Sequence, residues 1–492
     1  MLQPDPGWIA DSSRALVATA LAATERAAVP AFEKGLASCL AAFVVVFFSV
    51  ACSRAAAPAA PASSDASSSD VLDGQGAVDD AGGDGAGATD DATTAGDTVS
   101  GDAADTEPAD AASPDTDPAD AAVAVEPLNF FVTARMADAH VPGLAVAIVR
   151  DGKLVFTDAW GYADLDAKEP VTPDHVFLLG TGSQLVTGLA VMRLAEEGTI
   201  DLDAAVDTLA GFAVRNPAFD DTPVTARQLL AHTSSVDDDF DAVDSHYSIS
   251  SDGSGEDGGD YKLPLGAFLA DVLVPGGDWY DGDSVYTGFP PGENHRLSQT
   301  GIALAGWLVE KAAGQGFDTW CEAELFAPLG LQHTSFRLAD LNSEALVEPQ
   351  GWNDSGGWDA YGHYGFAGYP STTLRSTAAE AATLVAVLAG EGSFGATKIV
   401  SPATVAAMEK VVIVADGWGQ GLGVGTLVVA GAKRIGQVGG DYGAGSVLLY
   451  APDSGVSVAV VSNGDWAITS EMTDDALILE IAARLFADAE KM

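Results

Sequence analysis

Two apolar runs joined by a short polar turn open the foldable part of the chain. Residues 143–149 (GLAVAIV) form a continuous apolar run that predicts a buried strand, and 154–156 predict its returning partner. Asp151-Gly152 between them is a dipeptide that favours a two-residue hairpin turn. Apolar residues then recur at helical spacing from 186 to 197, and Gly198 ends the pattern, which predicts a helix.

The same two patterns recur along the rest of the chain. Helical spacing predicts a second helix over 300–313 and a last one over 473–486. Between them, apolar segments bounded by Gly, Pro, Asp and Ser predict strands over 421–429, 445–450 and 456–462. An early hairpin, a helical middle, late strands and a final helix predict an α+β fold. Its antiparallel sheet must join strands from the two ends of the chain.

A different pattern precedes these elements. Residues 35–53 carry no charge and follow Lys34, and their most apolar part has the length of an export signal rather than of a membrane span. The stretch ends in Ser49-Val50-Ala51-Cys52, which resembles a bacterial lipobox. We therefore predict that residues 1–52 are a signal peptide and that Cys52 is lipidated. The protein would then be an exported, membrane-anchored lipoprotein facing the periplasm or the cell surface. An uncleaved signal anchor is the alternative.

A long polar segment follows the predicted signal. Residues 53–126 contain Ala, Asp, Ser, Gly, Thr and Pro with almost no large apolar side chain. Such a segment buries too little apolar surface to offset the entropy lost on ordering, so we expect a disordered acidic linker. The foldable domain is then 127–492.

Acidic residues dominate the whole chain. It holds 71 acidic and 22 basic residues, and residues 126–492 alone hold 51 acidic and 18 basic ones. A surface of this sign repels phosphates, so nucleic acid is not an expected partner. Adaptation to a saline habitat explains the acidity, and binding of cations or of a basic partner is the alternative. No metal-ligand spacing or phosphate loop occurs, so no cofactor is predicted.

Six segments of the domain occur in the order and spacing of one known family. They are PGLAVAIVRDGKLVFTDAWGYAD (142–164), TPDHVFLLGTGSQLVTGLAVMRLAEEGTIDLDAAV (172–206), VTARQLLAHTSS (224–235), FPPGENHRLSQTGIALAGWLVEKAAGQ (289–315), FAPLGLQHTSF (326–336) and IGQVGGDYGAGSVLLYAPDSGVSVAVVSNGD (435–465). They resemble the serine β-lactamase-related family, which includes class C β-lactamases, D-alanyl-D-alanine carboxypeptidases and esterases. The resemblance implies a β-lactamase/transpeptidase-like fold, in which helices flank an antiparallel sheet and form a mostly helical subdomain.

The first catalytic motif of that family is altered in this chain. The family has G-S-x-[ST]-K, whose Ser attacks a carbonyl and whose Lys, one helical turn further on, takes the Ser proton. This chain has Gly180-Thr181-Gly182-Ser183-Gln184. Thr181 therefore stands at the nucleophile position and Gln184 at the lysine position. An amide neither accepts a proton near neutral pH nor carries charge. Ser183 is expected to bind ligand, together with Ser298, Gly439 and Gly440 of the other two motifs.

The other two motifs have lost their ionisable side chains too. In the second, Tyr-x-Asn, the phenol that shuttles a proton is replaced by Leu297, which Ser298 and Gln299 follow. In the third, [Lys/His]-x-Gly, the cation beside the substrate is replaced by Gln437, while Gly439-Gly440 remain. The glycines that shape the backbone are kept, and the groups that transfer protons or carry charge are replaced by Gln or Leu.

These motifs leave the function open. One hypothesis is a pseudoenzyme that binds a peptide, a cell-wall fragment or a protein partner without turning it over. The second is a diverged hydrolase of esters or amides, such as cell-wall peptides or β-lactam-like compounds, with Thr181 as nucleophile and His295 or His363 as base. His232, within the segment HTS, is expected to be structural. A surface coat that acts through its charge is the remaining alternative.

Three further features have both a functional and a structural interpretation. The acidic insert 236–262 could cap the expected cleft or bind a divalent cation, but its spacing matches no calcium loop and favours a solvated, mobile insertion. The aromatic loop 351–369, with Trp352, Trp358, Tyr361 and Tyr364, could wall a ligand site or simply pack. Cys321, alone within a helical pattern, is expected to be a small buried apolar residue.

Overall fold

The computed structural model describes residues 126–249, 259–353, 355–415, 417–464 and 477–492. The predicted signal peptide with Cys52, the predicted linker up to residue 125 and the central part of the acidic insert lie outside these ranges. Among the described residues, no helix has both the length and the apolar character that crossing a membrane would require.

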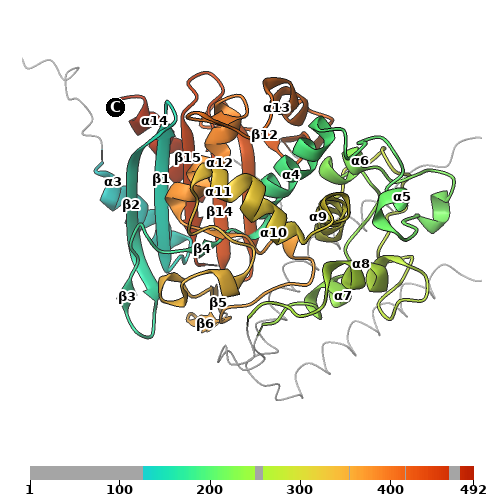
Figure 1. The fold of residues 1–492 in the computed structure, drawn as a ribbon. Helices are drawn as coiled ribbons and strands as arrows, with labels where there is room; N and C mark the ends of the chain where they lie inside the picture. The colour runs from blue at the N-terminus through green and yellow to red at the C-terminus, as the bar shows by residue number, and fades with distance from the viewer. Residues whose placement is uncertain (1–125, 250–258, 354, 416, 465–476) are drawn as a thin grey trace, which may run out of the picture. The chain divides into compact units, whose positions relative to one another are not determined.

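A nine-stranded antiparallel sheet forms the centre of the fold (Figure 1), in the order β10-β11-β12-β13-β14-β15-β1-β2-β3. Its strands are β1 (Gly143–Arg150), β2 (Lys153–Asp164), β3 (Glu169–Pro170), β10 (Ile413–Ala415), β11 (Trp418–Gln420), β12 (Gly425–Val429), β13 (Ala432–Asp441), β14 (Ala444–Tyr450) and β15 (Ser457–Ser462). Because β1 pairs with β15, strands from the two ends of the domain are adjacent. This confirms the predicted closure of the sheet.

The opening hairpin also forms as predicted. β1 and β2 are antiparallel neighbours. The turn residues Asp151 and Gly152 both have positive φ, 51° and 67°, as a type I′ turn requires. Asp and Gly are among the residues that adopt this conformation at least cost, so the local sequence selects the turn and the turn sets the strand pairing.

Side chains of the central strands alternate between two apolar cores, one on each face of the sheet. Ala147 packs on the face that α12 (Ala378–Ala389) covers, whereas its neighbour Val146 packs on the face of α3 (Leu128–Asp138) and α14 (Leu477–Ala489). This follows from the two-residue period of a strand. A strand with helices on both faces is apolar at every position, which explains the continuous apolar run of β1.

A second group of helices lies beside the sheet and forms the helical subdomain (Figure 1). Its helices are α4 (Gln184–Glu196), α5 (Asp207–Ala210), α6 (Ala226–Leu230), α7 (Phe240–Asp244), α8 (Leu265–Leu273), α9 (Gln299–Ala313), α10 (Phe317–Cys321) and α11 (Ala327–Leu329). α13 (Pro402–Glu409) packs on α4, and α4, α5, α6, α8 and α10 all contact α9. α9 is therefore the central helix of this part, and it ends where Gly314 turns to a φ of 69°.

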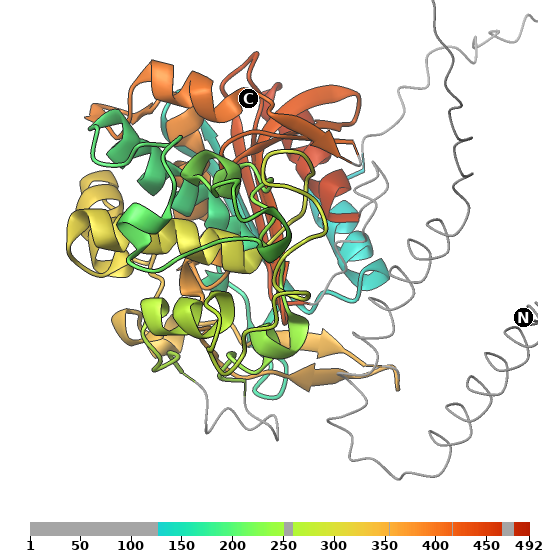
Figure 2. The same cartoon turned by 90° about the vertical axis from the view of Figure 1, so that its right-hand side faces the viewer.

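Short two-stranded pieces complete the described fold. They are β4 (Phe177–Leu178) with β7 (Arg375–Ser376), β5 (Gln350–Trp352) with β6 (Trp358–Ala360), and β8 (Ser393–Phe394) with β9 (Thr397–Lys398). The hairpin of β5 and β6 projects from the body in Figure 2. Cys321 is completely buried, as expected for a small apolar residue.

The structure corrects several element boundaries. The predicted strand 421–429 begins only at Gly425, because residues 421–424 form the turn from β11 and Gly423 has a φ of 73°. The last helix extends to Ala489 rather than ending at 486, and the predicted start of this helix at 473–476 lies outside the described ranges. β13, which carries the third motif, was not predicted because its glycines interrupt the apolar pattern.

Candidate active site

A tight turn of residues 180–183, directly before α4, presses against β13. A Cβ atom on Gly439 would lie 2.0 Å from the backbone nitrogen of Gly182, a contact that no side chain can make. Gly439 therefore allows the close approach of the two backbones. As a result Thr181 meets Gly440, whose N–H donates to Thr181 Oγ1 at 3.2 Å.

Gln184, at the lysine position, is buried and bonded to His232. Gln184 Oε1 lies 3.0 Å from His232 Nε2, while His232 Nδ1 accepts the N–H of Ser298 at 3.3 Å. A ring nitrogen that accepts an N–H carries no proton, so the ring is neutral and its Nε2–H donates to Gln184. Burial, and secondarily His295, lowers the pKa of His232 to about 3. His232 is thus neutral at pH 7 and holds the oxygen of the Gln184 amide.

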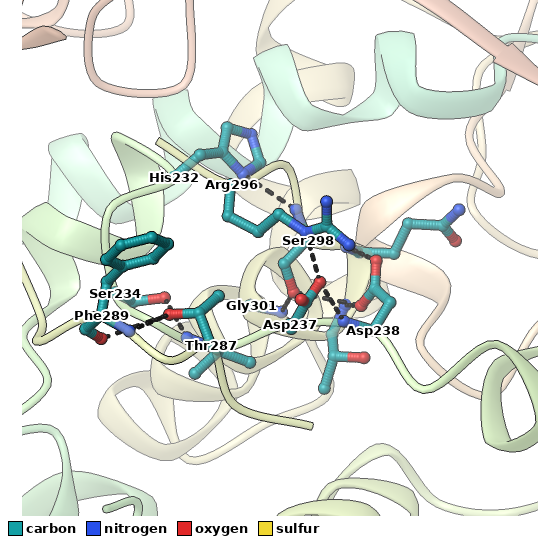
Figure 3. A network of polar contacts seen from close by, with 12 residues as sticks. His232, Ser234, Asp237, Asp238, Thr287, Phe289, Arg296, Ser298 and Gly301 are labelled. Carbon is teal, nitrogen blue, oxygen red and sulfur yellow. Dashed lines mark hydrogen bonds and ion pairs between the residues drawn. The ribbon is translucent and has the colours of Figure 1, made fainter. Parts of the chain in front are cut away.

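The start of α9 is held by a half-buried carboxylate of the acidic insert (Figure 3). Asp238 accepts the N–H groups of Gln299 at 2.8 Å and Thr300 at 2.9 Å, and the hydroxyl of Ser298 at 3.1 Å. Ser298 is itself the N-cap, because its Oγ accepts the N–H of Gly301 at 2.9 Å. A helix N-terminus has unpaired N–H groups and favours negative charge, which this arrangement supplies. The Ser298 hydroxyl therefore serves as a helix cap.

Several other described carboxylates of the insert are also bonded to the fold rather than solvated as expected. Asp237 pairs with Arg296 at 2.7 Å. Asp239 is the N-cap of α7, and Asp260 accepts the N–H of Leu338 at 2.9 Å. The composition of the insert shows only that these residues are charged. Their structural role depends on which backbone N–H groups or arginine side chains lie next to them in the fold. In the described ranges, no group of three or more His, Cys, Asp or Glu side chains is placed to hold a metal ion.

A tyrosine of the insert reaches the site, which the sequence analysis missed. Tyr247 Oη lies 3.1 Å from Gln299 Oε1 and 3.2 Å from Asp441 Oδ2. Gln299 stands at the asparagine position of the second motif, and Asp441 directly follows Gly440. Burial, and next the charge of Asp441, raises the pKa of Tyr247 well above its ordinary value. The only sequence signal was an aromatic residue within a polar, acidic stretch.

Three of the predicted site residues have side chains that are exposed or bonded to other parts of the fold. Leu297, at the position of the phenol, is 62% exposed. Gln437 is buried, and its amide nitrogen donates to the carbonyl of Gly423 at 3.2 Å. Ser183 is buried, and its hydroxyl is bonded to two backbone groups. The four residues Thr181, Gln184, Gln299 and Gly440 are called the Thr181 site below.

The two histidines considered as bases lie in different surroundings. The ring of His295 meets the ring of His232 edge-on, with 5.9 Å between the centroids. His363 is half-buried, and burial together with the charge of Arg375 lowers its pKa to about 4. His363 is therefore mostly neutral at pH 7.

The aromatic loop divides into two parts. In the β5–β6 hairpin, Trp352 meets Trp358 edge-on at 4.9 Å and stacks on His140 at 4.0 Å. Tyr364 is fully buried, and its hydroxyl donates to the carbonyl of Tyr442 at 2.6 Å. Tyr364 thus packs against the turn that follows β13, while the hairpin stays at the surface.

Comparison with known proteins agrees with this geometry. The family model named Beta-lactamase matches residues 128–483. Penicillin-binding protein 4 of Amycolatopsis lactamdurans is 31% identical over 356 residues, which cover 68% of this chain and 84% of that protein. Protein flp of Staphylococcus aureus is 27% identical over 205 residues, which cover 42% of this chain and only 37% of the length of that relative.

Solved structures show the same fold. The octameric penicillin-binding protein homologue from Pyrococcus abyssi has a TM-score of 0.59 at 24% identity, over 73% of this chain and 77% of that one. The D-amino acid amidase of Ochrobactrum anthropi SV3, complexed with L-phenylalanine, has a TM-score of 0.58 at 18% identity, over 74% of this chain and 99% of that one. Together with the family model, which spans most of this chain, they confirm the predicted resemblance and fold class. The chain belongs to the β-lactamase family.

Proposed function

We propose that this protein is a non-catalytic member of the family, which binds a ligand at the Thr181 site without turning it over. The observation that carries the proposal is the pair of neutral side chains at the lysine position, where His232 donates to the Gln184 oxygen at 3.0 Å. The family places a proton acceptor at this position, and this chain places an amide there.

Acyl transfer needs a base for the Thr181 hydroxyl, because an alcohol is a weak nucleophile until its proton is removed. The Gln184 amide accepts no proton near neutral pH. His232 is the imidazole bonded to that amide, but burial lowers its pKa to about 3 and its Nδ1 already accepts the Ser298 N–H. Loss of one member of such a catalytic unit usually removes several orders of magnitude of rate.

The groups that remain at the site suit a neutral ligand. The Gly440 N–H, the Thr181 hydroxyl and the amide nitrogen of Gln184 are hydrogen-bond donors without charge. Such donors match the carbonyl groups of a peptide or a cell-wall fragment. The two cations of the family motifs are replaced by Gln184 and Gln437, so a ligand carboxylate would lose the charge-assisted bonds that strengthen its binding.

The expected location of the domain supports the same kind of ligand. With residues 1–52 as signal peptide and Cys52 as lipid attachment site, the acidic domain would be tethered outside the cytoplasm, where cell-wall fragments occur. A palmitate label that is incorporated into the full chain, and lost in Cys52→Ala, is the expected result. Equal labelling of the variant would contradict a lipid at this residue.

Intact-protein mass spectrometry of the full chain tests the lack of turnover. The folded protein is exposed to a penicillin and, separately, to a fluorophosphonate, with Thr181→Ala as the matched control. We expect no adduct in either protein. Binding is then measured as the rise in Tm that soluble peptidoglycan fragments cause, since a ligand that binds only the folded state stabilises it.

A diverged hydrolase is the second candidate, and one observation favours it. The Gly440 N–H donates to Thr181 Oγ1, so a backbone donor lies beside the proposed nucleophile, where it could turn to the oxyanion formed from an attacked carbonyl oxygen. A stoichiometric adduct on the native chain that is absent from Thr181→Ala would establish this function and contradict the first. The base would then be sought at His295 or His363.

A further inference from the structure

We propose that the Tyr247 strap, defined as residues Asp244–Ser248, is a built-in gate that closes the Thr181 site and must move before a bulky ligand enters. The gate rests on the proposed function in one respect, namely that ligands bind at the Thr181 site. The contacts of the strap support the gate, and the experiment that tests it requires neither a bound ligand nor turnover.

One side chain of the strap joins the two structural elements that border the site. Tyr247 Oη contacts Gln299 at the start of α9 and Asp441 at the end of β13, at 3.1 and 3.2 Å. In this fold the second and third motifs stand on these two elements. The Tyr247 hydroxyl therefore bridges the helical subdomain and the sheet at the place where the family motifs converge.

The contact between Tyr247 and Asp441 lies one residue away from the contact between Gly440 and Thr181. Asp441 directly follows Gly440, and the Gly440 N–H donates to Thr181 at 3.2 Å. A ligand oxygen that replaces the Thr181 hydroxyl at this N–H comes within one residue of the Tyr247–Asp441 contact. The Tyr247 hydroxyl lies between Asp441 and Gln299, so a bulky ligand that extends from Gly440 past Asp441 toward Gln299 has to displace it.

The ring of Tyr247 is seated on other aromatic residues. It stacks on Phe366 with 4.5 Å between the centroids and meets Tyr442 edge-on at 5.4 Å. Tyr442 in turn donates its hydroxyl to Asp244, at the other end of the strap, at 3.0 Å. Only 9% of Tyr247 is exposed, so the closed position is well packed.

Few backbone bonds hold the strap to the body. The Ser248 N–H donates to the carbonyl of Gly365 at 2.9 Å, and the Ala367 N–H donates to that of His246 at 3.0 Å. The Gly365 N–H donates back to the hydroxyl of Ser248 at 2.7 Å. His246 of the strap packs on Phe268 and Trp279, so opening of the strap breaks these ring contacts as well as the hydrogen bonds. The strap lies outside the sheet and the long helices, and local opening of such a segment costs less free energy than unfolding of the whole domain.

A thiol introduced at position 181 reports whether the strap closes the site. The full-length variant Thr181→Cys is treated with fluorescein maleimide, a bulky thiol reagent suited to a partly exposed position, and the labelled peptides are followed by mass spectrometry. We expect the introduced thiol to react much more slowly than an unstructured one. Adding Tyr247→Phe should raise its rate about fivefold, because the ring stays while the hydroxyl contacts are lost. Tyr247→Ala should raise it further.

Two controls separate opening from other effects. Tyr286→Phe removes a buried hydroxyl that donates to Leu273 at 3.3 Å, outside the Thr181 site, and should leave the rate unchanged. The buried Cys321 becomes reactive only if the whole domain unfolds, so it must stay unlabelled. An equal rate at position 181 with and without Tyr247→Phe, while Cys321 is protected, would overturn the gate. That outcome leaves the mass-spectrometric test of turnover unaffected.

Discussion

At the residue scale, His232 determines what the lysine position of this family can do in this chain. Its Nδ1 accepts a backbone N–H, which leaves the ring proton on Nε2 and directs it at Gln184 Oε1. The pair satisfies its hydrogen bonds with neither partner charged, and so it can be buried without the cost of desolvating an ion. A lysine at position 184 would face the Nε2–H of this ring, so Gln184 and His232 form a consistent pair.

The first prediction concerns the pH dependence of stability. The pKa of His232 is about 3 in the folded state, whereas an unfolded histidine has a pKa of about 6.5. The unfolded state therefore binds the proton first as the pH falls. The stability that His232 contributes is complete above pH 6.5 and is lost progressively down to about pH 3, by at most about 1.4 kcal/mol per pH unit. Urea unfolding at a series of pH values measures the slope.

The matched variant for this measurement is His232→Gln, which keeps a neutral amide beside Gln184 but does not titrate. As the pH falls from about 6 to about 4, its free energy of unfolding should decrease less steeply than that of the native chain. The difference between the two slopes should correspond to about one bound proton. Asp238, whose pKa burial raises, acts in the opposite direction but is present in both proteins. Identical slopes would show that His232 is not buried in its neutral form.

At the scale of elements, the acidic insert supports the helix that carries the second motif. Asp238 supplies acceptors to the first N–H groups of α9, and Asp237 beside it pairs with Arg296. The two residues are adjacent in sequence, half-buried and of the same charge, but Asp238 accepts helix-start N–H groups whereas Asp237 forms an ion pair with the partly exposed Arg296. They are therefore a natural matched pair for mutation.

The second prediction is that Asp238→Ala lowers the free energy of unfolding by about 2–3 kcal/mol. The change leaves two N–H groups at the helix start without their acceptor and removes a carboxylate that the helix dipole favours. Asp237→Ala should cost about 1 kcal/mol or less, because ion pairs near the surface contribute little. Denaturant titration of both variants checks the order, and equal losses would contradict a capping role for Asp238.

At the scale of the whole molecule, the described fold has to hold together a strongly acidic chain. Residues 126–492 contain 51 acidic and 18 basic residues. Some carboxylates are bonded at helix starts or in ion pairs with arginines, such as Arg484 with Asp488 at 2.6 Å. The remaining excess of negative charge opposes the compact state through self-repulsion.

The third prediction is a rise of stability with salt. Increasing the ionic strength from about 0.01 M to about 0.15 M shortens the screening length from about 30 Å to about 8 Å. Repulsion across the surface should weaken, and Tm and the free energy of unfolding should rise. Chloride and sulfate at equal ionic strength distinguish screening from ion exclusion. Stability that is flat or falls in chloride would contradict net repulsion.

Features that depend on local patterns could be predicted from the amino-acid sequence. The hairpin turn at Asp151-Gly152, the helices α4 and α9 and the joining of β1 to β15 follow from residue periodicity and turn chemistry, and all are present. The amino-acid sequence also predicts substitutions at positions 181, 184, 297 and 437, because these residues stand at fixed offsets from the glycines and prolines of each motif.

The groups that those substituted positions meet depend on tertiary packing. His232 lies 48 residues from Gln184, and Tyr247 lies 52 residues from Gln299 and 194 from Asp441. No local pattern encodes such contacts, because they form when distant elements pack, either within the helical subdomain or between it and the end of β13. For the same reason the carboxylates of the insert were expected to be solvated, although several lie against helix starts. Local periodicity reports which face of an element is buried, whereas the partner of a buried polar group depends on how distant elements pack.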